Sequence, residues 1–315
     1  MNSSSASDTA STVHGCVQYI PQGTFDQTTP EAYGWIVFIA VINIITCPLT
    51  AATNALIIIV VKTKHRLKTK SNIALACLST TDLAMGVIGQ PIFISVAIAE
   101  LQRDSPTYCI RILLSRIALR VLSIASLSHL AMLNVERYIA IKRPLRYETI
   151  VTEKRLICLS ALLWISVLLL NVSSSFIDKK LYIAVDNGMI IFCVATIVLC
   201  QVLLYHETRR HQKQIATHQV SLEAREKFLK ERKAFKVTAT VLFFLILCYL
   251  PSIVARTLIS YSVVNSVNLA YVALSTAYTT AILNSLVNPI IYCVRIAPFR
   301  VAFIQLMCGK KPQAS

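Results

Sequence analysis

The chain has 315 residues and a formal net charge of +16, yet only 15% of its residues are charged and 55% are hydrophobic. A soluble domain usually carries about 25% charged residues, so this composition argues against one. The basic excess would suit nucleic-acid binding, but most of it lies in short segments between apolar runs, and this placement argues against that function.

Seven apolar segments can be drawn along the chain, and each is long enough to cross the hydrocarbon core of a bilayer as a helix. Their approximate bounds are 34–61, 72–97, 112–139, 157–176, 188–206, 236–260 and 268–293. This pattern predicts an all-α membrane protein, a seven-transmembrane helix bundle. No internal repeat is evident, which argues against a transporter.

The placement of Lys and Arg predicts the orientation of the bundle. Residues 1–33 contain none, whereas basic residues gather in 62–71, 137–156, 208–236 and the tail after residue 293. Because basic loops stay in the cytosol, residues 1–33 are expected to be an extracellular tail and residues 34–293 to form the membrane domain. Asn2, in an Asn-Ser-Ser sequence, is then a candidate glycosylation site.

Residues 294–315 are expected to form a short amphipathic helix followed by a short cytoplasmic tail. The apolar face of this helix would contain Phe299, Phe303, Leu306 and Met307. Such a helix lies along a membrane surface, and Cys308 beside it is a candidate for palmitoylation. An unmodified thiol is the alternative for Cys308.

The third span is the most unusual of the seven. Its middle, from Val121 to Val135, has no charge and carries only small hydroxyls, one His and one Asn. This pattern predicts a helix buried on every side, with His129 as a packed, hydrogen-bonded residue. The span ends in Glu136-Arg137-Tyr138, and Pro144-Leu145 follow.

Six of the spans carry a recognisable motif, in a fixed order along the chain. The motifs are Asn54, Asn72-Ile73-Ala74-Leu75-Ala76 with Asp82-Leu83, Glu136-Arg137-Tyr138, Trp164, Cys248-Tyr249-Leu250-Pro251 and Asn288-Pro289-Ile290-Ile291-Tyr292. Together they resemble the motifs of rhodopsin-like (class A) G-protein-coupled receptors. A second outer loop without cysteine and a fifth span without proline resemble more loosely the melanocortin, lysolipid, cannabinoid and adenosine receptors.

The resemblance implies a plasma-membrane receptor that binds an extracellular ligand and activates a heterotrimeric G protein. Arg137, in the Glu136-Arg137-Tyr138 motif, would be held by Glu136 and by Glu231 at the base of the sixth span. Release of this contact would let the sixth helix move outward. Lipid phosphate is the alternative partner of Arg137.

The resemblance also assigns further residues to the activation switch: Tyr205, Tyr249, Pro251, Asn288, Pro289 and Tyr292. The two prolines interrupt helical hydrogen bonds and provide hinges. Tyr249 stands where the family usually has Trp, and Leu245 where it usually has Phe. We therefore expect a smaller packing pair at this position.

A carboxylate at mid-membrane depth is costly unless it is bound. In the family, the position of Asp82 binds an allosteric sodium ion together with residues that here are Ser126, Asn284 and Ser285. These side chains all bear oxygen, which suits a hard cation. The alternative is a protonated Asp82 hydrogen-bonded to the same groups. No other cofactor is implied.

The family's usual disulfide, from the top of the third span to the second outer loop, has no counterpart here. No cysteine lies between residues 171 and 192, and Cys109 comes about three residues early. Cys16 and Cys109 either pair with each other or remain free.

Three arginines indicate the class of ligand. Arg116 and Arg120 share one face of the third span, and Arg256 follows Pro251 in the sixth. In the family these regions face one cavity, which Tyr249 would also line, so we expect the arginines to bind a carboxylate or phosphate of an acidic small molecule, lipid or peptide. Leu119 occupies the position where amine receptors carry Asp, which argues against a monoamine.

The arginines have alternative roles, since they could reach the membrane surface or pair with Asp178, Asp186 or Glu100. Two other functions also remain open: a receptor-like protein that signals without ligand or acts by heterodimerising, and a transporter or channel. An enzyme is not expected, because the sequence contains no nucleophile–base pair, phosphate loop or metal-ligand cluster.

Overall fold

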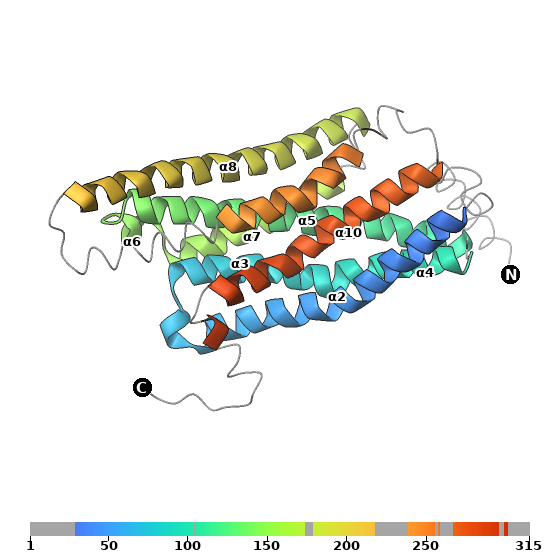
Figure 1. Cartoon of the computed structure of the whole chain (residues 1–315), viewed down its shortest axis with the longest axis horizontal. Helices are drawn as coiled ribbons and strands as arrows, with labels where there is room; N and C mark the ends of the chain where they lie inside the picture. The colour runs from blue at the N-terminus through green and yellow to red at the C-terminus, as the bar shows by residue number, and fades with distance from the viewer. Residues whose placement is uncertain are drawn as a thin grey trace.

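The computed structural model describes residues 29–103, 105–173, 179–217, 239–255, 258, 267–295 and 299–301. Within these ranges every element is helical (Figure 1). The long helices are α2 (Pro30–Thr63), α3 (Lys70–Ala84), α4 (Gln90–Leu101), α5 (Ser105–Lys142), α7 (Glu153–Ser173), α8 (Lys179–Thr217), Ala239–Ala255 and α10 (Val267–Arg295). The short elements are η1 (His65–Leu67), the π-helical turn η2 (Met85–Gly89) and α6 (Tyr147–Ile150). The prediction of an all-α bundle is confirmed.

Each predicted span corresponds to a helix, but several helices are longer than predicted. α3, η2 and α4 join into one rod that contains the second span, α5 begins before the predicted boundary at residue 112, and α8 continues past residue 206. Hydropathy marks only the apolar part of a helix, whereas the backbone hydrogen bonds of a helix continue into water. Within the described ranges, five helices are long and apolar enough to cross a membrane: Pro30–Thr63, Lys70–Leu101, Glu153–Ser173, Asn187–Arg210 and Asn268–Val294.

Threonine caps begin the first two spans. Thr29 Oγ1 accepts a hydrogen bond from the backbone N–H of Ala32 at 3.3 Å, and Pro30 occupies the first turn of α2. Thr69 Oγ1 likewise accepts from the N–H of Asn72 at the start of α3. Each cap satisfies a backbone donor that the first turn of a helix leaves unpaired. These two threonines therefore mark where the helices start.

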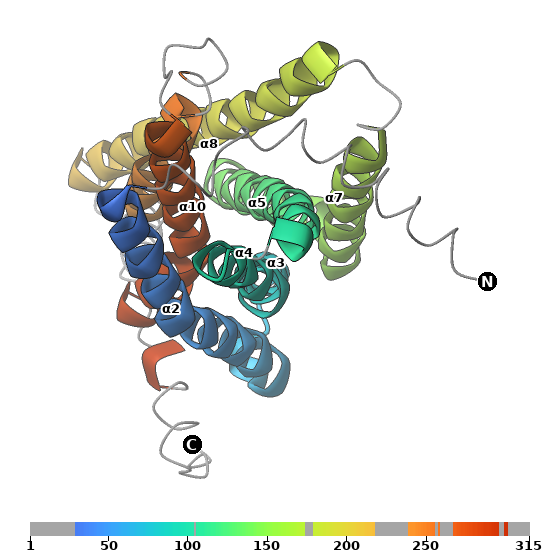
Figure 2. The ribbon, with the colours of Figure 1, turned by 90° about the vertical axis from the view of Figure 1, so that its right-hand side faces the viewer.

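The 38-residue helix α5 lies at the centre of the bundle (Figure 2). It packs against α3, α4, α7, α8 and α10. Almost every side chain from Val121 to Asn134 is buried, as the lack of charge in this stretch predicted. His129 is hydrogen-bonded through Nδ1 to the Ala125 carbonyl and through Nε2 to Ser160 Oγ, which confirms its structural role.

The outside of the bundle is apolar and its interior contains polar groups. Large hydrophobic side chains on the surface, such as Ile45, Leu169 and Phe192, are more than half exposed. Buried polar side chains, in contrast, include Asn54, Asp82 and Asn288. This arrangement suits a protein surrounded by lipid, whose polar groups must find partners inside the bundle. α2 begins and α10 ends at opposite ends of the bundle (Figure 1).

The π-helical turn brings the second span into close contact with α2. A Cβ atom added to Gly86 would lie 2.7 Å from the backbone nitrogen of Ala51. Cys47 of α2 also donates a hydrogen bond through its thiol to the Gly86 carbonyl. A residue without a side chain is therefore required where the two backbones approach.

We predict that Gly86→Ala destabilises the protein by about 1–3 kcal/mol, because the added methyl group must push the α2 backbone away. Thermal unfolding of the purified protein in detergent measures this loss. Gly34→Ala is the matched control, since an added Cβ there meets nothing within 4 Å. Equal melting temperatures for Gly86→Ala and the wild type would contradict the close packing.

Candidate functional site

The functional residues fall into three groups along the bundle: a buried carboxyl group in the middle, a polar cluster at the Arg137 end, and a cavity toward the other end. Helix α5 contributes to all three. Ser126 lies at the middle group, Glu136 and Arg137 at the second, and Arg116 and Arg120 at the cavity.

Asp82 is fully buried and holds three helices together. Its Oδ1 atom accepts hydrogen bonds from Ser126 of α5 and Ser285 of α10, both at 2.8 Å. Its Oδ2 atom accepts from Nδ2 of Asn288 at 2.9 Å. The structure thus brings together Asp82, Ser126 and Ser285 as predicted, and it adds Asn288, which the sequence assigned only to the activation switch.

Asn284, the fourth residue of the predicted sodium site, has no direct bond to Asp82. It is buried, but no hydrogen bond from it to Asp82 is found among the described residues, and its Oδ1 atom has no partner there. The Oδ1 atom of Asn288 and the hydroxyl of Tyr292 are also buried without partners in this part of the chain. All three residues lie on α10, and Asn288 is bonded directly to Asp82. Oxygen atoms of this kind are the ligands that a hard cation prefers.

Asn54 links the first span to the same region. Its Nδ2 atom donates to the backbone carbonyl of Ser285 at 3.0 Å and to that of Thr50 in its own helix. Asn54 therefore joins α2 to the part of α10 that carries Ser285 and Asn288, the hydrogen-bond partners of Asp82.

Glu136 is the centre of the second group and is only 2% exposed. Its Oε1 atom accepts hydrogen bonds of 2.5 Å from Ser71 Oγ and from the hydroxyl of Tyr147 in α6. Arg137 lies beside it, with Nε 3.6 Å from Oε2. The pairing of Glu136 with Arg137 is as predicted, whereas Ser71 and Tyr147 are partners that the motif did not reveal.

Tyr147 connects the loop after α5 to two spans. Burial raises the pKa of its phenol, with the nearby Glu136 as a second cause, so the hydroxyl stays protonated and donates to the carboxylate. The Lys70 ammonium group lies 5.2 Å from the centre of its ring, and Lys70 also pairs with Glu148 in α6. The short helix α6 is thereby attached to α3 and α5.

The other predicted switch residues lie on α5, α8, α10 and the helix Ala239–Ala255. Pro289 and Tyr292 are buried in α10, Tyr138 is half-buried, and Pro251 lies within the helix Ala239–Ala255. Tyr205 is 40% exposed, and the Arg209 guanidinium on the same helix lies 4.8 Å from its ring centre. Tyr249 and Leu245 are both buried in the main hydrophobic core, as expected for a packing pair.

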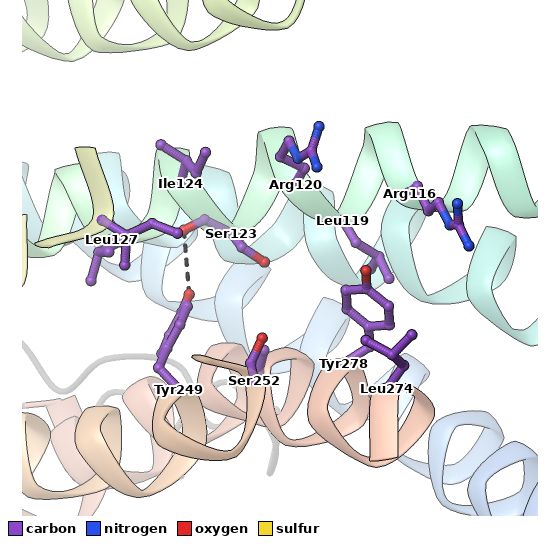
Figure 3. A pocket seen from close by; sticks show the side chains of 12 residues that line it. Arg116, Leu119, Arg120, Ser123, Ile124, Leu127, Tyr249, Ser252, Leu274 and Tyr278 are labelled. Atoms are coloured by element: carbon purple, nitrogen blue, oxygen red, sulfur yellow. Dashed lines mark hydrogen bonds between the residues drawn. The ribbon is translucent and has the colours of Figure 1, made fainter. Parts of the chain in front are cut away.

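A cavity of about 180 Å³ lies between α5, α8, the helix Ala239–Ala255 and α10 (Figure 3). The predicted residues Arg116, Leu119, Arg120 and Tyr249 all line it. The hydroxyl of Tyr249 donates to the Ser123 carbonyl at 3.3 Å and so closes the inner end of the cavity against α5. None of the residues that line the described cavity is acidic.

The sequence did not identify the rest of the cavity wall, which consists of Ser123, Ile124, Leu127, Ile190, Ser252, Leu274, Tyr278 and Ala281. On α5, however, the lining positions recur every three or four residues from Arg116 to Leu127. This helical spacing could have identified them once Arg116 and Arg120 were placed in the cavity. The lining residues of the other helices depend on packing that no local pattern reveals.

Several predicted features fall outside the described residues: Asn2, Cys16, Asp178, Glu231, Arg256 and Cys308. Cys109 is disulfide-bonded, and the other cysteines within the described ranges are free, so its partner also lies outside them. The pairing of Cys109 with Cys16 stays a prediction. Glu100, an alternative partner of the arginines, is instead hydrogen-bonded to Tyr271 of α10.

We predict that Tyr147→Phe destabilises the protein by about 1–3 kcal/mol, because the buried Glu136 carboxylate loses one of its donors. The melting temperature of the purified protein measures the loss. Tyr33→Phe is the control, since Tyr33 is 52% exposed at the start of α2. If both variants melt at the wild-type temperature, the hydrogen bond does not contribute to stability.

Comparison with known proteins identifies the family of this chain. The family model described as "7 transmembrane receptor (rhodopsin family)" matches residues 53–182 and 171–292. The histamine H2 receptor of Homo sapiens is 25% identical, over 91% of this chain and 84% of that protein. The histamine H2 receptor of Cavia porcellus is 27% identical, over 86% of this chain and 80% of that protein. The chain, with its motifs on a helical bundle, therefore belongs to the rhodopsin family of seven-transmembrane receptors.

Proposed function

We propose that this protein is a plasma-membrane receptor that binds an anionic extracellular ligand beside Arg116 and Arg120 and activates a heterotrimeric G protein. The observation that carries the proposal is the cavity of Figure 3, where two guanidinium groups and several hydroxyls line one space. Arginine binds carboxylate and phosphate groups through paired hydrogen bonds. A carboxylate or phosphate compound of small size fits both the charge and the volume.

The cavity does not suit the ligand named for the relatives. Histamine carries a protonated amine, and a buried ammonium group needs an acidic partner. Leu119 provides none, and Arg116 and Arg120 on either side of it would repel a cation. At 25–27% identity, the relatives support the fold and the receptor class, while the side chains of this cavity support a different ligand.

The helix α5 offers a route from the cavity to the G protein. Arg116 lies about 31 Å along α5 from Arg137, at about 1.5 Å per residue. A ligand at the arginines would contact Tyr249, whose bond to Ser123 joins the helix Ala239–Ala255 to α5. Breaking that bond would free this helix to pivot near Pro251 and open the Arg137 end to a G protein.

Activation also requires Arg137 to leave the acidic groups that hold it in the inactive state. We propose that Glu231, at the base of the sixth span, is one of these groups, in addition to Glu136. Because Glu136 is already held by Ser71 and Tyr147, its carboxylate would keep partners when Arg137 moves. The motif can therefore open without leaving a buried charge unpaired.

Sodium bound beside Asp82 would stabilise the inactive arrangement. The three neighbours of Asp82 carry donors that would stabilise its ionised form. The unpaired oxygens of Asn284 and Asn288 would complete the coordination. The ion would draw α3, α5 and α10 together, and a shift of α10 near Pro289 would disperse its ligands.

We further propose that the first 33 residues are extracellular and the C-terminal end is cytosolic, as the basic segments indicate. Glycosylation of Asn2, palmitoylation of Cys308 and a Cys16–Cys109 disulfide all fit this orientation.

We predict that one class of anionic probe raises the melting temperature of the purified receptor, with succinate, adenosine monophosphate and lysophosphatidic acid as test compounds. A ligand at 100 times its Kd stabilises by about 2.7 kcal/mol, which a thermal-shift assay detects. Arg116→Gln or Arg120→Gln should weaken the binding about tenfold or more, the effect of a lost charge-assisted hydrogen bond.

Arg111→Gln is the matched control, because it removes the same charge from the same helix at a residue that does not line the cavity. This control should bind like the wild type. Stabilisation by histamine but by none of the anions would contradict the proposal, as would full binding by the Arg116→Gln/Arg120→Gln double variant.

We also predict that sodium chloride raises the melting temperature relative to choline chloride, and that Asp82→Asn abolishes the difference. The ion binds only the folded bundle, so its concentration shifts unfolding. Glu100→Gln, a change in another buried carboxyl group of the same span, should keep the sodium effect. Identical melting of the wild type in the two salts would favour a protonated Asp82.

A further inference from the structure

A second hollow, separate from the arginine cavity, lies on the outside of the bundle. This α5–α7–α8 groove has a volume of about 450 Å³. Its walls include Met132 and Ile139 of α5, Leu159 and Leu163 of α7, and Phe192 of α8. Figure 2 shows α7 and α8 on either side of α5. The residues that line the groove come from these three helices and from the α6 region.

The groove opens away from the protein interior. Phe192 is 71% exposed and Leu159 is 43% exposed on its rim. In a chain with apolar, membrane-length helices, such side chains contact lipid rather than water. The occupant must therefore be apolar over most of its length and enter from the bilayer.

The end of the groove nearest Arg137 is polar and carries a usable positive charge. Arg155, at the start of α7, lines this end. Among the described residues, Nη1 is the one atom of its guanidinium that is hydrogen-bonded, to the carbonyls of Thr149 and Ile150. Glu136 also lines the groove, but its carboxylate already accepts from Ser71 and Tyr147 and lies beside Arg137. The remaining donors of the Arg155 guanidinium are thus the charged groups available to an occupant.

We propose that this groove binds a phospholipid of the cytosolic leaflet, with one acyl chain along the apolar wall and an anionic headgroup on Arg155. From Arg155 to Leu163 the wall is about 12 Å long at 1.5 Å per residue, so it follows much of one leaflet's half of the hydrocarbon core. Basic residues at the cytosolic ends of spans attract anionic lipids. The leaflet assignment rests on the orientation proposed above.

The site would connect lipid composition to the activation cluster. The bound chain would touch Ile150 of α6 and the α5 turn that carries Glu136. α6 also supplies Tyr147, one of the two donors to Glu136. An anionic lipid would thereby hold α6 and α7 in a fixed relation to the Glu136–Arg137 pair.

The test uses full-length receptor in phosphatidylcholine nanodiscs that contain a small fraction of phosphatidylserine with a photoreactive diazirine on one acyl chain. The comparison sample contains the same fraction of diazirine phosphatidylcholine. Peptide mass spectrometry then locates the crosslinks. We expect groove residues to be labelled about fivefold more by the serine lipid, the preference that one basic residue near the surface gives.

Five variants make the result specific. Arg155→Gln should remove the preference and Arg155→Lys should keep it, while the neighbouring Lys154→Gln should behave like the wild type. Leu159→Trp should fill the groove and reduce labelling by both lipids, whereas Ile157→Trp, at an exposed position outside the groove, should not. Size-exclusion chromatography confirms that each variant is folded and monodisperse.

Three outcomes would overturn the proposal: equal labelling by both lipids in the wild type, a preference that survives Arg155→Gln, or groove labelling no higher than that of Ile45 on the exposed face of α2. Displacement of the label by added cholesterol would assign the groove to a sterol and would equally overturn it. Since no receptor ligand is used, the result is independent of whether the arginine cavity binds an anion.

Discussion

The buried carboxyl group of Asp82 is the constraint on which the packing of the bundle depends. A carboxyl group at this depth must find partners inside the protein, because lipid offers none. The partners come from α5 and α10, and Asn54 secures α2 to α10 beside them. Because this one buried group needs several donors, polar residues of α5 and α10 converge on it.

The central helix α5 connects the three groups of functional residues. It carries the arginines of the cavity, the serine that binds Asp82, and the Glu136–Arg137 pair, all on one rigid element. Between Val121 and Asn134 almost every side chain of α5 is buried, so this part of the helix is fixed by contacts on all sides. The helix Ala239–Ala255 contacts it through the Tyr249–Ser123 bond, where the cavity and the core meet.

The sequence was sufficient to predict the helices, but it identified only part of each site: Arg116, Leu119, Arg120 and Tyr249 were the predicted residues that line the cavity. Apolar runs predicted the spans, and the uncharged stretch from Val121 to Val135 correctly predicted a buried α5. The sequence did not reveal the bond from Asn288 to Asp82, because which residue of α10 reaches this carboxyl group depends on how the helices pack. The bond from Tyr147 to Glu136 depends on how a loop folds back, which no local pattern specifies.

The most direct test of the account is second-messenger output, cAMP and calcium, in cells that express the wild type or Arg137→Ala at equal surface levels. Cells are measured unstimulated and with succinate, adenosine monophosphate and lysophosphatidic acid. The account predicts a response to an anionic compound in the wild type that Arg137→Ala loses. An equal response in both, or a response to histamine alone, would contradict it.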